Sequence, residues 1–329
     1  MTEQTPDLLD PNRAPSRDGV LRAAAKIAEI LAPTPLLPLT VDGRTIWCKA
    51  ECLQPIGSFK IRGAWNRMTD LTAEQRALGV VGVSSGNHAQ GVAWAARRLG
   101  TTAIIVMPAD APQAKIAATR ALGAETVLYD RMTESRDVIA ADITAKTGRM
   151  LVHAFGDPWV IEGQGSVGIE AEAQMRAATG HGIDTIIACC GGGGLASGLA
   201  LACPDARVTL VEPEGWDDVT RSLESGTICT VENPPPTACD ALQTPGTYPI
   251  NFAVLQARGV NGVTVSEAEV ANAQHVAFER LHLVVEPGGA VALAAVLAGK
   301  VAVSDATMVT LSGGNVDAAA YARVIAEAV

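Results

Sequence analysis

From residue 80 onward, short apolar runs alternate with amphipathic stretches. In the stretch 87–100, Val92, Ala96 and Leu99 fall on one helical face, and Gly100 stands where a helix would end. The apolar runs on either side have the length of strands. The pattern therefore predicts a βαβαβ unit, with strands at 80–86, 102–108 and 124–130 and helices at 87–100 and 113–123.

The same alternation begins again in the second half of the chain. It predicts strands at 150–155, 184–190, 206–214 and 306–315, and helices at 134–146, 163–179, 194–203 and 266–281. The fold class is therefore α/β, with two units of mostly parallel sheet. The segment 231–252 holds five prolines and has no clear period, so we predict a functional or mobile loop.

Three turns follow predicted strands at the sheet edge where open α/β folds bind ligands. They read SSGNH (84–88), CCGGGGLASG (189–198) and LSGGN (311–315). Glycines let several main-chain N–H groups approach one anion, and the dipole of a following helix adds to the attraction. Four successive glycines, Gly191–Gly194, exceed what a tight packing turn needs, so they favour a phosphate site.

The glycine turn also supports a rival interpretation. Gly191, Gly193 and Ala196 fit the G-x-G-x-x-A pattern of dinucleotide sites, and Glu212 lies about 20 residues further on, where such a site places its ribose-binding acid. On this turn alone, an NAD-dependent oxidoreductase is a fair hypothesis. It gives no role to Lys60 or to the other two turns.

The SSGNH turn exposes main-chain N–H groups at a predicted helix start, which suits a carboxylate. Asn87 could donate to a ligand oxygen and Ser85 could carry a proton. Taken alone, however, the turn is better interpreted as a plain helix N-cap, where serine and asparagine are favoured. His88 is a candidate general base by residue type. A helix N-terminus disfavours the cationic ring, so we predict a neutral hydrogen-bonding or packing group.

Composition and charge narrow the partners. The net charge of −10 argues against nucleic acid. Seven cysteines without C-x-x-C spacing and a polar N-terminus predict a cytoplasmic protein with reduced thiols and no signal peptide. The charge-free span 185–204 is interrupted by four glycines, so we predict no membrane helix. The charge does not exclude anionic small ligands, which main-chain N–H groups can hold locally.

Lys60 follows Gly57, Ser58 and Phe59 and precedes Ile61 in an apolar turn. Removal from water lowers the pKa of a lysine and makes its amine a nucleophile. A nucleophilic lysine, a phosphate cradle and a carboxylate cradle together suit a pyridoxal phosphate Schiff base, which positions an amino acid for cleavage at Cα.

Five sequence blocks, GSFKIRGA, SSGNHAQGVA, GGGGLASG, VEPGGAVALAA and LSGGN, resemble the signature blocks of fold-type II pyridoxal phosphate enzymes. They are similar to the serine/threonine dehydratase branch, which includes serine racemase and threo-3-hydroxyaspartate ammonia-lyase. The resemblance runs from about residue 30 to 316 and implies a tryptophan synthase β-like fold. The smaller domain (55–157) would be inserted in the larger, pyridoxal phosphate-binding domain (1–54 and 158–329).

The resemblance also implies roles for matching positions. Lys60 would form the Schiff base and remove the α-proton, and Ser85 would act on the opposite face. The cofactor contacts would be Phe59, Lys60, Asn87, Gly191, Gly192, Gly193, Gly194, Leu195 and Ser312, with Ser312 facing the pyridine nitrogen. The substrate contacts would be Ser84, Ser85, Gly86, Asn87 and His88.

The acidic segment VEPEGWDD (211–218) has two interpretations. By itself it is typical of a solvated acidic loop, whereas the resemblance implies a Mg²⁺ or Ca²⁺ site at Glu212, the carbonyl of Trp216, and Asp218.

The resemblance implies a small-molecule amino-acid substrate and a homodimer. The implied activity is dehydration of a β-hydroxy-α-amino acid such as serine, threonine or 3-hydroxyaspartate to a 2-oxo acid and ammonia. The hydroxyl of Ser312 would leave the pyridine nitrogen unprotonated, which favours prompt elimination. The closest alternative is an amino-acid racemase, and a non-catalytic amino-acid binding protein is a third. Gly288 and the stretches 153–158 and 237–245 depart from the family pattern, which leaves the substrate side chain open.

Overall fold

The computed structural model describes residues 10, 12–84, 86–130 and 132–327. Its strands are β1 (Leu36–Val41), β2 (Arg44–Ala50), β3 (Val80–Val83), β4 (Ala103–Pro108), β5 (Glu125–Tyr129), β6 (Met150–Val152), β7 (Thr185–Cys189), β8 (Arg207–Pro213), β9 (Asn261–Val265) and β10 (Thr307–Leu311). Its α-helices are α1 (Arg17–Ala28), α2 (Lys60–Thr69), α3 (Ala73–Leu78), α4 (Asn87–Leu99), α5 (Gln113–Ala121), α6 (Arg136–Thr147), α7 (Pro158–Thr179), α8 (Gly194–Ala202), α9 (Asp218–Ser225), α10 (Pro249–Ala257), α11 (Glu267–Leu281), α12 (Pro287–Leu297) and α13 (Ala318–Glu327). Short 3₁₀ turns are η1 (Glu51–Leu53) and η2 (Asp240–Leu242).

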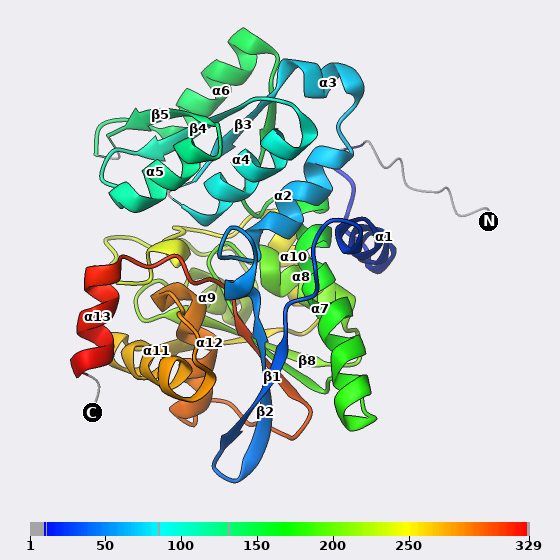
Figure 1. The fold of residues 1–329 in the computed structure, drawn as a ribbon, viewed down its shortest axis with the longest axis vertical. Helices are drawn as coiled ribbons and strands as arrows, with labels where there is room; N and C mark the ends of the chain where they lie inside the picture. The colour runs from blue at the N-terminus through cyan, green and yellow to red at the C-terminus, as the bar shows by residue number, and fades with distance from the viewer. Residues whose placement is uncertain (1–9, 11, 85, 131, 328–329) are drawn as a thin grey trace, which may run out of the picture.

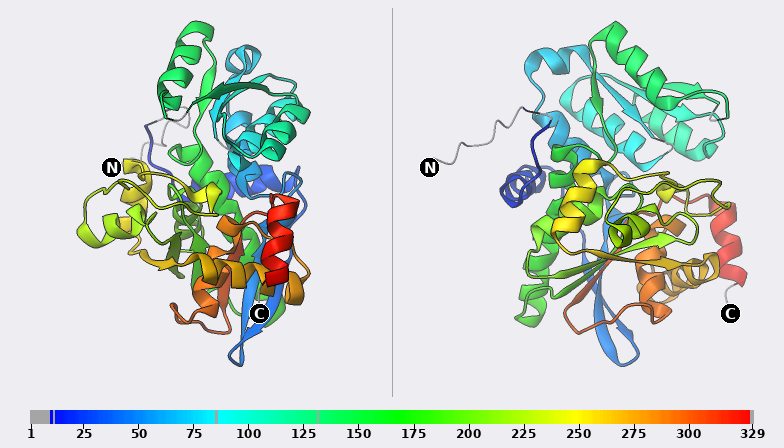
Figure 2. Two further views of the ribbon diagram at one scale, coloured as in Figure 1. Left: turned by 90° about the vertical axis from the view of Figure 1, so that its left-hand side faces the viewer. Right: turned by 180° about the vertical axis from the view of Figure 1, so that it is seen from behind.

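The strands form two sheets. The larger has the order β1-β2-β10-β7-β8-β9, and the smaller has the order β5-β4-β3-β6. All neighbours are parallel except the β1–β2 hairpin. The prediction of two mostly parallel α/β sheets is therefore confirmed. The smaller sheet lies above the larger one in Figure 1, with α2 between them, and the turned views of Figure 2 show the same separation.

The smaller sheet lies between β2 and β7 in the chain, as an inserted unit would. The predicted domain boundaries, after residues 54 and 157, stay a prediction. Most predicted elements are present within a few residues. The β1–β2 hairpin and β9 of the larger sheet were not predicted. Among the predicted elements, the main difference is α7, which begins at Pro158 rather than residue 163. Asp157 caps it by accepting from the N–H of Val160, and a proline in the first turn suits a helix start.

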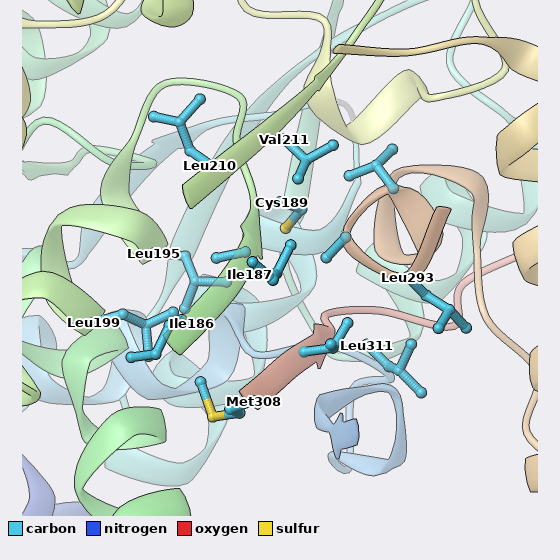
Figure 3. Packing of buried hydrophobic residues seen from close by; sticks show 14 of the residues in the cluster. Ile186, Ile187, Cys189, Leu195, Leu199, Leu210, Val211, Leu293, Met308 and Leu311 are labelled. Atoms are coloured by element: carbon cyan, nitrogen blue, oxygen red, sulfur yellow. The ribbon is translucent and has the colours of Figure 1, made fainter. Parts of the chain in front are cut away.

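The core of the larger sheet is apolar and well packed. Side chains from β7, β8, β10, α8 and α12 converge in Figure 3, among them Ile187, Leu210, Leu293 and Met308. Strands of this kind are buried on both faces, and their side chains are therefore apolar in succession rather than alternating. This is why 184–190 reads as one apolar run.

Close helix packing fixes the two helix starts that matter most for the site. A Cβ atom on Gly163 of α7 would lie 2.6 Å from the Cα of Gly63 in α2. A Cβ on Gly198 of α8 would lie 2.5 Å from the main-chain nitrogen of Gly165 in α7. Such contacts leave no room for a side chain, so α7 holds α2 and α8 at backbone distance. The N-termini of α2 and α8 carry Lys60 and the glycine turn.

Candidate active site

Lys60 is the first residue of α2, and Phe59 precedes it as the N-cap. Its Nζ donates to the carbonyl of Ala154 at 2.8 Å and lies 5.2 Å from the centre of the Phe59 ring. Burial lowers the pKa of Lys60 to about 8, while the thiols of Cys189 and Cys190 act in the opposite direction. A substantial fraction of this amine is therefore neutral near pH 8, as a nucleophile or base requires.

The turn Gly191–Gly194 connects β7 to α8, and no side chain caps that helix. Gly193 has a φ of +92°, which other residues rarely adopt. A Cβ on Gly192 would lie 2.4 Å from the ring of Phe155. Glycine is thus required at both positions, by backbone conformation and by space. The resulting helix start offers main-chain N–H groups to an anion.

The turn after β3 leads into α4. The N–H of Gly86 donates to Oγ of Ser84 at 3.1 Å within the turn. The N-cap of α4 is Gly86, so neither Ser84 nor Asn87 is the helix cap that the alternative interpretation expected. Ser85 lies outside the described residues. His88 is buried, and its Nε2 lies 2.8 Å from the carbonyl oxygen of Val152. Burial lowers the pKa of His88 to about 3, which agrees with the prediction of a neutral ring.

Asn87 lies in a network that the sequence analysis did not find. Its Nδ2 donates to Oε1 of Glu286 at 2.5 Å, and its Oδ1 accepts from Asn315 at 2.8 Å. Lys115 lies 3.5 Å from Glu286 and donates to Asp240 at 2.5 Å. The amide orientation of Asn87 is therefore fixed, with one N–H of Nδ2 left for a ligand. Burial raises the pKa of Glu286 to about 7.

Ser312 follows β10 and is held by its main chain. Its carbonyl accepts from the N–H of Phe59 at 3.1 Å, and its own N–H donates to Gly289 at 3.3 Å. The thiol of Cys189 donates to its hydroxyl oxygen at 3.1 Å. The hydroxyl is buried, and its residue lines the same pocket as Lys60.

Other pocket residues were missed because they lie in segments without a motif. Arg136, the first residue of α6, lines the pocket, and its nearest charged partner among the described residues is Asp137 at 3.9 Å. Phe155 packs against Tyr248 and His153 with ring-centre distances of 5.2 and 4.7 Å. Burial lowers the pKa of His153 to about 4, and the charges of Lys60 and Arg136 lower it further. The sequence signal was departure from the family pattern, at 153–158 and also at 237–245 and Gly288, which all contribute to the lining of the same pocket.

The predicted cofactor and substrate residues come together. Those that line one pocket are Phe59, Lys60, Ser84, Gly86, Asn87, His88, Gly191, Gly192, Gly193, Gly194, Leu195 and Ser312. The pocket thus combines a buried amine, an uncapped glycine-rich helix start, an asparagine with a free donor and a hydroxyl. These groups fit an aldehyde-bearing heterocycle with a phosphate.

The predicted metal ligands lie apart from this pocket. Glu212, on β8, accepts from the main-chain N–H groups of Val219 and Thr220 at 3.1 and 2.8 Å and from the Thr220 hydroxyl at 2.6 Å. Oδ2 of Asp218 is buried without a hydrogen-bond partner in the described part of the chain. Burial raises the pKa of Glu212 to about 8 and that of Asp218 to about 7. Within the described ranges, no three His, Cys, Asp or Glu side chains are grouped to hold a metal. The metal ion stays a prediction.

Comparison with known proteins gives a consistent result. The family model described as "Pyridoxal-phosphate dependent enzyme" matches residues 27–314. L-threo-3-hydroxyaspartate ammonia-lyase from Pseudomonas sp. is 38% identical over 315 residues, which covers 93% of this chain and 97% of that protein. Threonine deaminase from T.th. is 42% identical with a TM-score of 0.84, covering 92% of this chain and 99% of that one. Maize serine racemase is 34% identical with a TM-score of 0.87, covering 96% and 98%.

Proposed function

The chain belongs to the pyridoxal-phosphate dependent enzyme family, and from that premise we propose that it dehydrates a β-hydroxy-α-amino acid that carries a side-chain carboxylate, of the 3-hydroxyaspartate type. The products would be a 2-oxo acid and ammonia. One observation carries the proposal: the Lys60 amine lines one pocket with the glycine turn and with Arg136. The ammonia-lyases among its relatives support the reaction type.

When bound, pyridoxal phosphate supplies an electron sink for the negative charge that develops at Cα. We assign Lys60 to hold the cofactor and to take the α-proton. Its lowered pKa suits both tasks, because a neutral amine can accept a proton near the working pH. The carbonyl of Ala154 holds Nζ at 2.8 Å and so fixes the direction of that amine.

The other pocket residues are assigned by the hydrogen-bonding or packing groups that they present to the cofactor and the substrate. We assign the main-chain N–H groups of Gly191–Gly194 and Leu195 to the phosphate, and Phe59 to packing beside the ring. Asn87 would donate its free N–H to the ring oxygen, because Glu286 and Asn315 take its other positions. The turn from Ser84 to His88 would hold the α-carboxylate of the substrate, and Ser312 would face the ring nitrogen.

The charged groups in the pocket indicate which substrate side chain it binds. Among the described residues, three basic side chains line the pocket: Lys60, Lys115 and Arg136. Lys115 is already paired with Asp240 and Glu286. Arg136 has only the 3.9 Å contact with its neighbour Asp137 among the described residues, so its guanidinium is available to a second carboxylate. Serine and threonine would leave this partly exposed cation to water, without the carboxylate contact.

The test is a substrate panel assayed for 2-oxo acid with the wild type, Arg136→Met and the surface control Arg98→Gln. We expect the wild type to prefer L-threo-3-hydroxyaspartate over L-serine and L-threonine. Arg136→Met should lower kcat/KM for hydroxyaspartate roughly tenfold to a hundredfold, the value of one charge-assisted contact, and change that for serine less than about twofold. Equal losses on both substrates, or a wild type that prefers serine, would overturn the proposed specificity.

Racemisation is the second candidate, supported by the serine racemases among the relatives. The same panel, assayed for the opposite enantiomer, separates the two activities. Formation of enantiomer without 2-oxo acid would replace the lyase proposal.

We also keep the proposals of a Mg²⁺ or Ca²⁺ ion at Glu212, Trp216 and Asp218, of a homodimer and of a cytoplasmic location. The buried, unpartnered oxygen of Asp218 supports the ion. In the described part of the chain, no helix is long and apolar enough to span a bilayer.

A further inference from the structure

Two adjacent cysteines end β7 and begin the glycine turn, and they face different surroundings. Cys189 is buried and lines the pocket, and its Sγ donates to the hydroxyl oxygen of Ser312 at 3.1 Å. The thiol of Cys190 instead donates to the carbonyl of Gly191 at 3.3 Å. Figure 3 shows Cys189 among the core side chains at the end of β7. The reaction as proposed above uses neither thiol.

The contact between Cys189 and Ser312 is restrained from both sides. β7 and β10 are neighbouring parallel strands, and the N–H of Cys189 donates to the hydroxyl of Thr310 at 3.3 Å. The main chain of Ser312 is held by Phe59 and Gly289. What stays free at Ser312 is the rotation of its hydroxyl, and the Cys189 thiol is the side-chain partner of that hydroxyl in the described residues.

A hydroxyl has one hydrogen to donate and two lone pairs to accept with. If the thiol donates to the oxygen, the O–H hydrogen is free to point into the pocket. If Ser312 donated to the sulfur, a lone pair would face the pocket instead. The two arrangements would present a ring nitrogen with opposite partners: a donor favours the unprotonated nitrogen, and an acceptor favours the protonated one.

The geometry of the contact favours the first arrangement, because Sγ of Cys189 is placed to donate to the Ser312 oxygen at 3.1 Å. Burial agrees with it: it raises the pKa of Cys189 to about 11, so the sulfur stays a thiol and does not become a thiolate, which could only accept. In the thiolate form the Ser312 hydroxyl would instead donate to the sulfur, and this contact and the Lys60 charge oppose the rise without cancelling it.

We propose that Cys189 is a positioning residue: by donating to the oxygen of Ser312, it directs the Ser312 O–H toward the cofactor ring nitrogen and keeps that nitrogen unprotonated. The inference rests on the proposed function, because it needs pyridoxal phosphate in this pocket. It adds a residue that acts only through Ser312 and that needs no contact with the substrate.

The test compares five variants with the wild type: Cys189→Ala, Cys189→Ser, Ser312→Ala, the double variant Cys189→Ala/Ser312→Ala, and the matched control Cys190→Ala. Two readouts do not depend on turnover. One is the dissociation constant of pyridoxal phosphate from the refilled apoenzyme. The other is the pH dependence of the absorption band of the bound cofactor. Thermal unfolding checks that each variant is folded.

We expect Cys189→Ala to weaken cofactor binding about fivefold, the size of one ordinary hydrogen bond, and to shift the titration of the band. Cys189→Ser should restore both, because a hydroxyl can also donate to Ser312. Cys190→Ala should behave as the wild type. In the Ser312→Ala background, removal of the Cys189 thiol should cost nothing further, because the two residues act as one unit.

Three results would overturn the inference. One is a Cys189→Ala variant with unchanged affinity and titration. Another is an equal loss in the presence and absence of the Ser312 hydroxyl, which would mark a packing role. The last is a Cys190→Ala variant that loses as much as Cys189→Ala. A wild type that binds no pyridoxal phosphate, or whose cofactor band survives Lys60→Ala, would overturn the proposed function itself and the inference with it.

Discussion

Two neighbouring strands of the larger sheet end in turns that treat the next helix start in opposite ways. After β7, Gly191–Gly194 leads into α8 with glycine at the N-cap and no capping side chain. After β8, Glu212 turns its carboxyl group back onto the N–H groups of Val219 and Thr220 in α9. The start of α8 is available to an external anion, whereas the start of α9 is filled by the chain itself.

The difference shows that a position at the carboxyl edge of a sheet does not by itself make a ligand site. Glu212 would be the ribose-binding acid of a dinucleotide site, but three donors within the chain already occupy its oxygens. The glycine turn fits a dinucleotide motif locally, yet the acid that should complete the motif is engaged elsewhere. The geometry therefore agrees with the pyridoxal-phosphate family and not with the NAD-dependent oxidoreductase.

The largest effect should come from removing the Lys60 amine, the reactive group that lines the same pocket as the glycine turn. Lys60→Ala should lower turnover by at least about a thousandfold, because it removes both the covalent anchor and the base. The control Lys26→Ala removes a partly exposed ion pair with Asp70 and should keep full activity. Activity assays and circular dichroism measure both variants. Appreciable dehydration by folded Lys60→Ala protein would contradict the assignment.

The next effect tests whether the α8 start binds phosphate. Gly193→Ala should weaken pyridoxal phosphate binding about tenfold or more, because the turn must leave its φ of +92° and loses charge-assisted N–H contacts. Gly226→Ala is the matched control, with a φ of +73° at the end of α9 and no neighbour closer than 3.9 Å to an added Cβ. Both should lose about 1 kcal/mol or more of unfolding free energy. Equal cofactor affinities in the two variants would contradict the assignment of the α8 start to the cofactor phosphate.

A smaller effect tests the turn at Glu212, through the pH dependence of the free energy of unfolding. The folded pKa of Glu212, about 8, lies above the ordinary 4.5, so between these values the native protein holds a proton that the unfolded chain releases. The free energy of unfolding should therefore fall as pH rises from 5 to 8, by at most about 1.4 kcal/mol per pH unit from this group. With EDTA present to exclude a bound cation, Glu212→Gln should match the wild type near pH 5 and exceed it at pH 8. Denaturant titrations that show Glu212→Gln weaker at every pH would mean an ionised carboxylate.

The smallest effect concerns the predicted cation. After EDTA treatment, Mg²⁺ or Ca²⁺ at about ten times its dissociation constant should raise Tm by about 2–4 °C, and Asp218→Asn should abolish the rise. Differential scanning calorimetry measures it. A Tm indifferent to both ions would leave Glu212 as a helix cap without a metal.

Local pattern was enough for much of the fold and for one half of the site. Apolar runs of strand length and helical faces ending in glycine predicted the alternation of strands and helices. The glycine turn and the lysine in an apolar turn could be recognised because their chemistry lies in consecutive residues. Where local signals conflicted, the predicted helix boundary was wrong. The glycines within α7 disfavour a helix, so its start was predicted at residue 163 instead of Pro158, although Asp157 and Pro158 are a typical helix start.

The rest of the site was decided by tertiary structure. Asn87 and Glu286 are 199 positions apart, and Lys115 and Asp240 are 125 apart, so no spacing rule connects them. Arg136 becomes a candidate carboxylate ligand only because α6 packs on the smaller sheet beside the pocket. Glu212 looked free in the sequence because its partners, seven and eight residues further on, reach it only when α9 folds back onto β8.

The sequence by itself determined which residues could do chemistry, since that depends on side-chain type and near neighbours. Only the folded chain decided which of them are already paired, because pairing depends on distances that the packing of the sheets and helices sets.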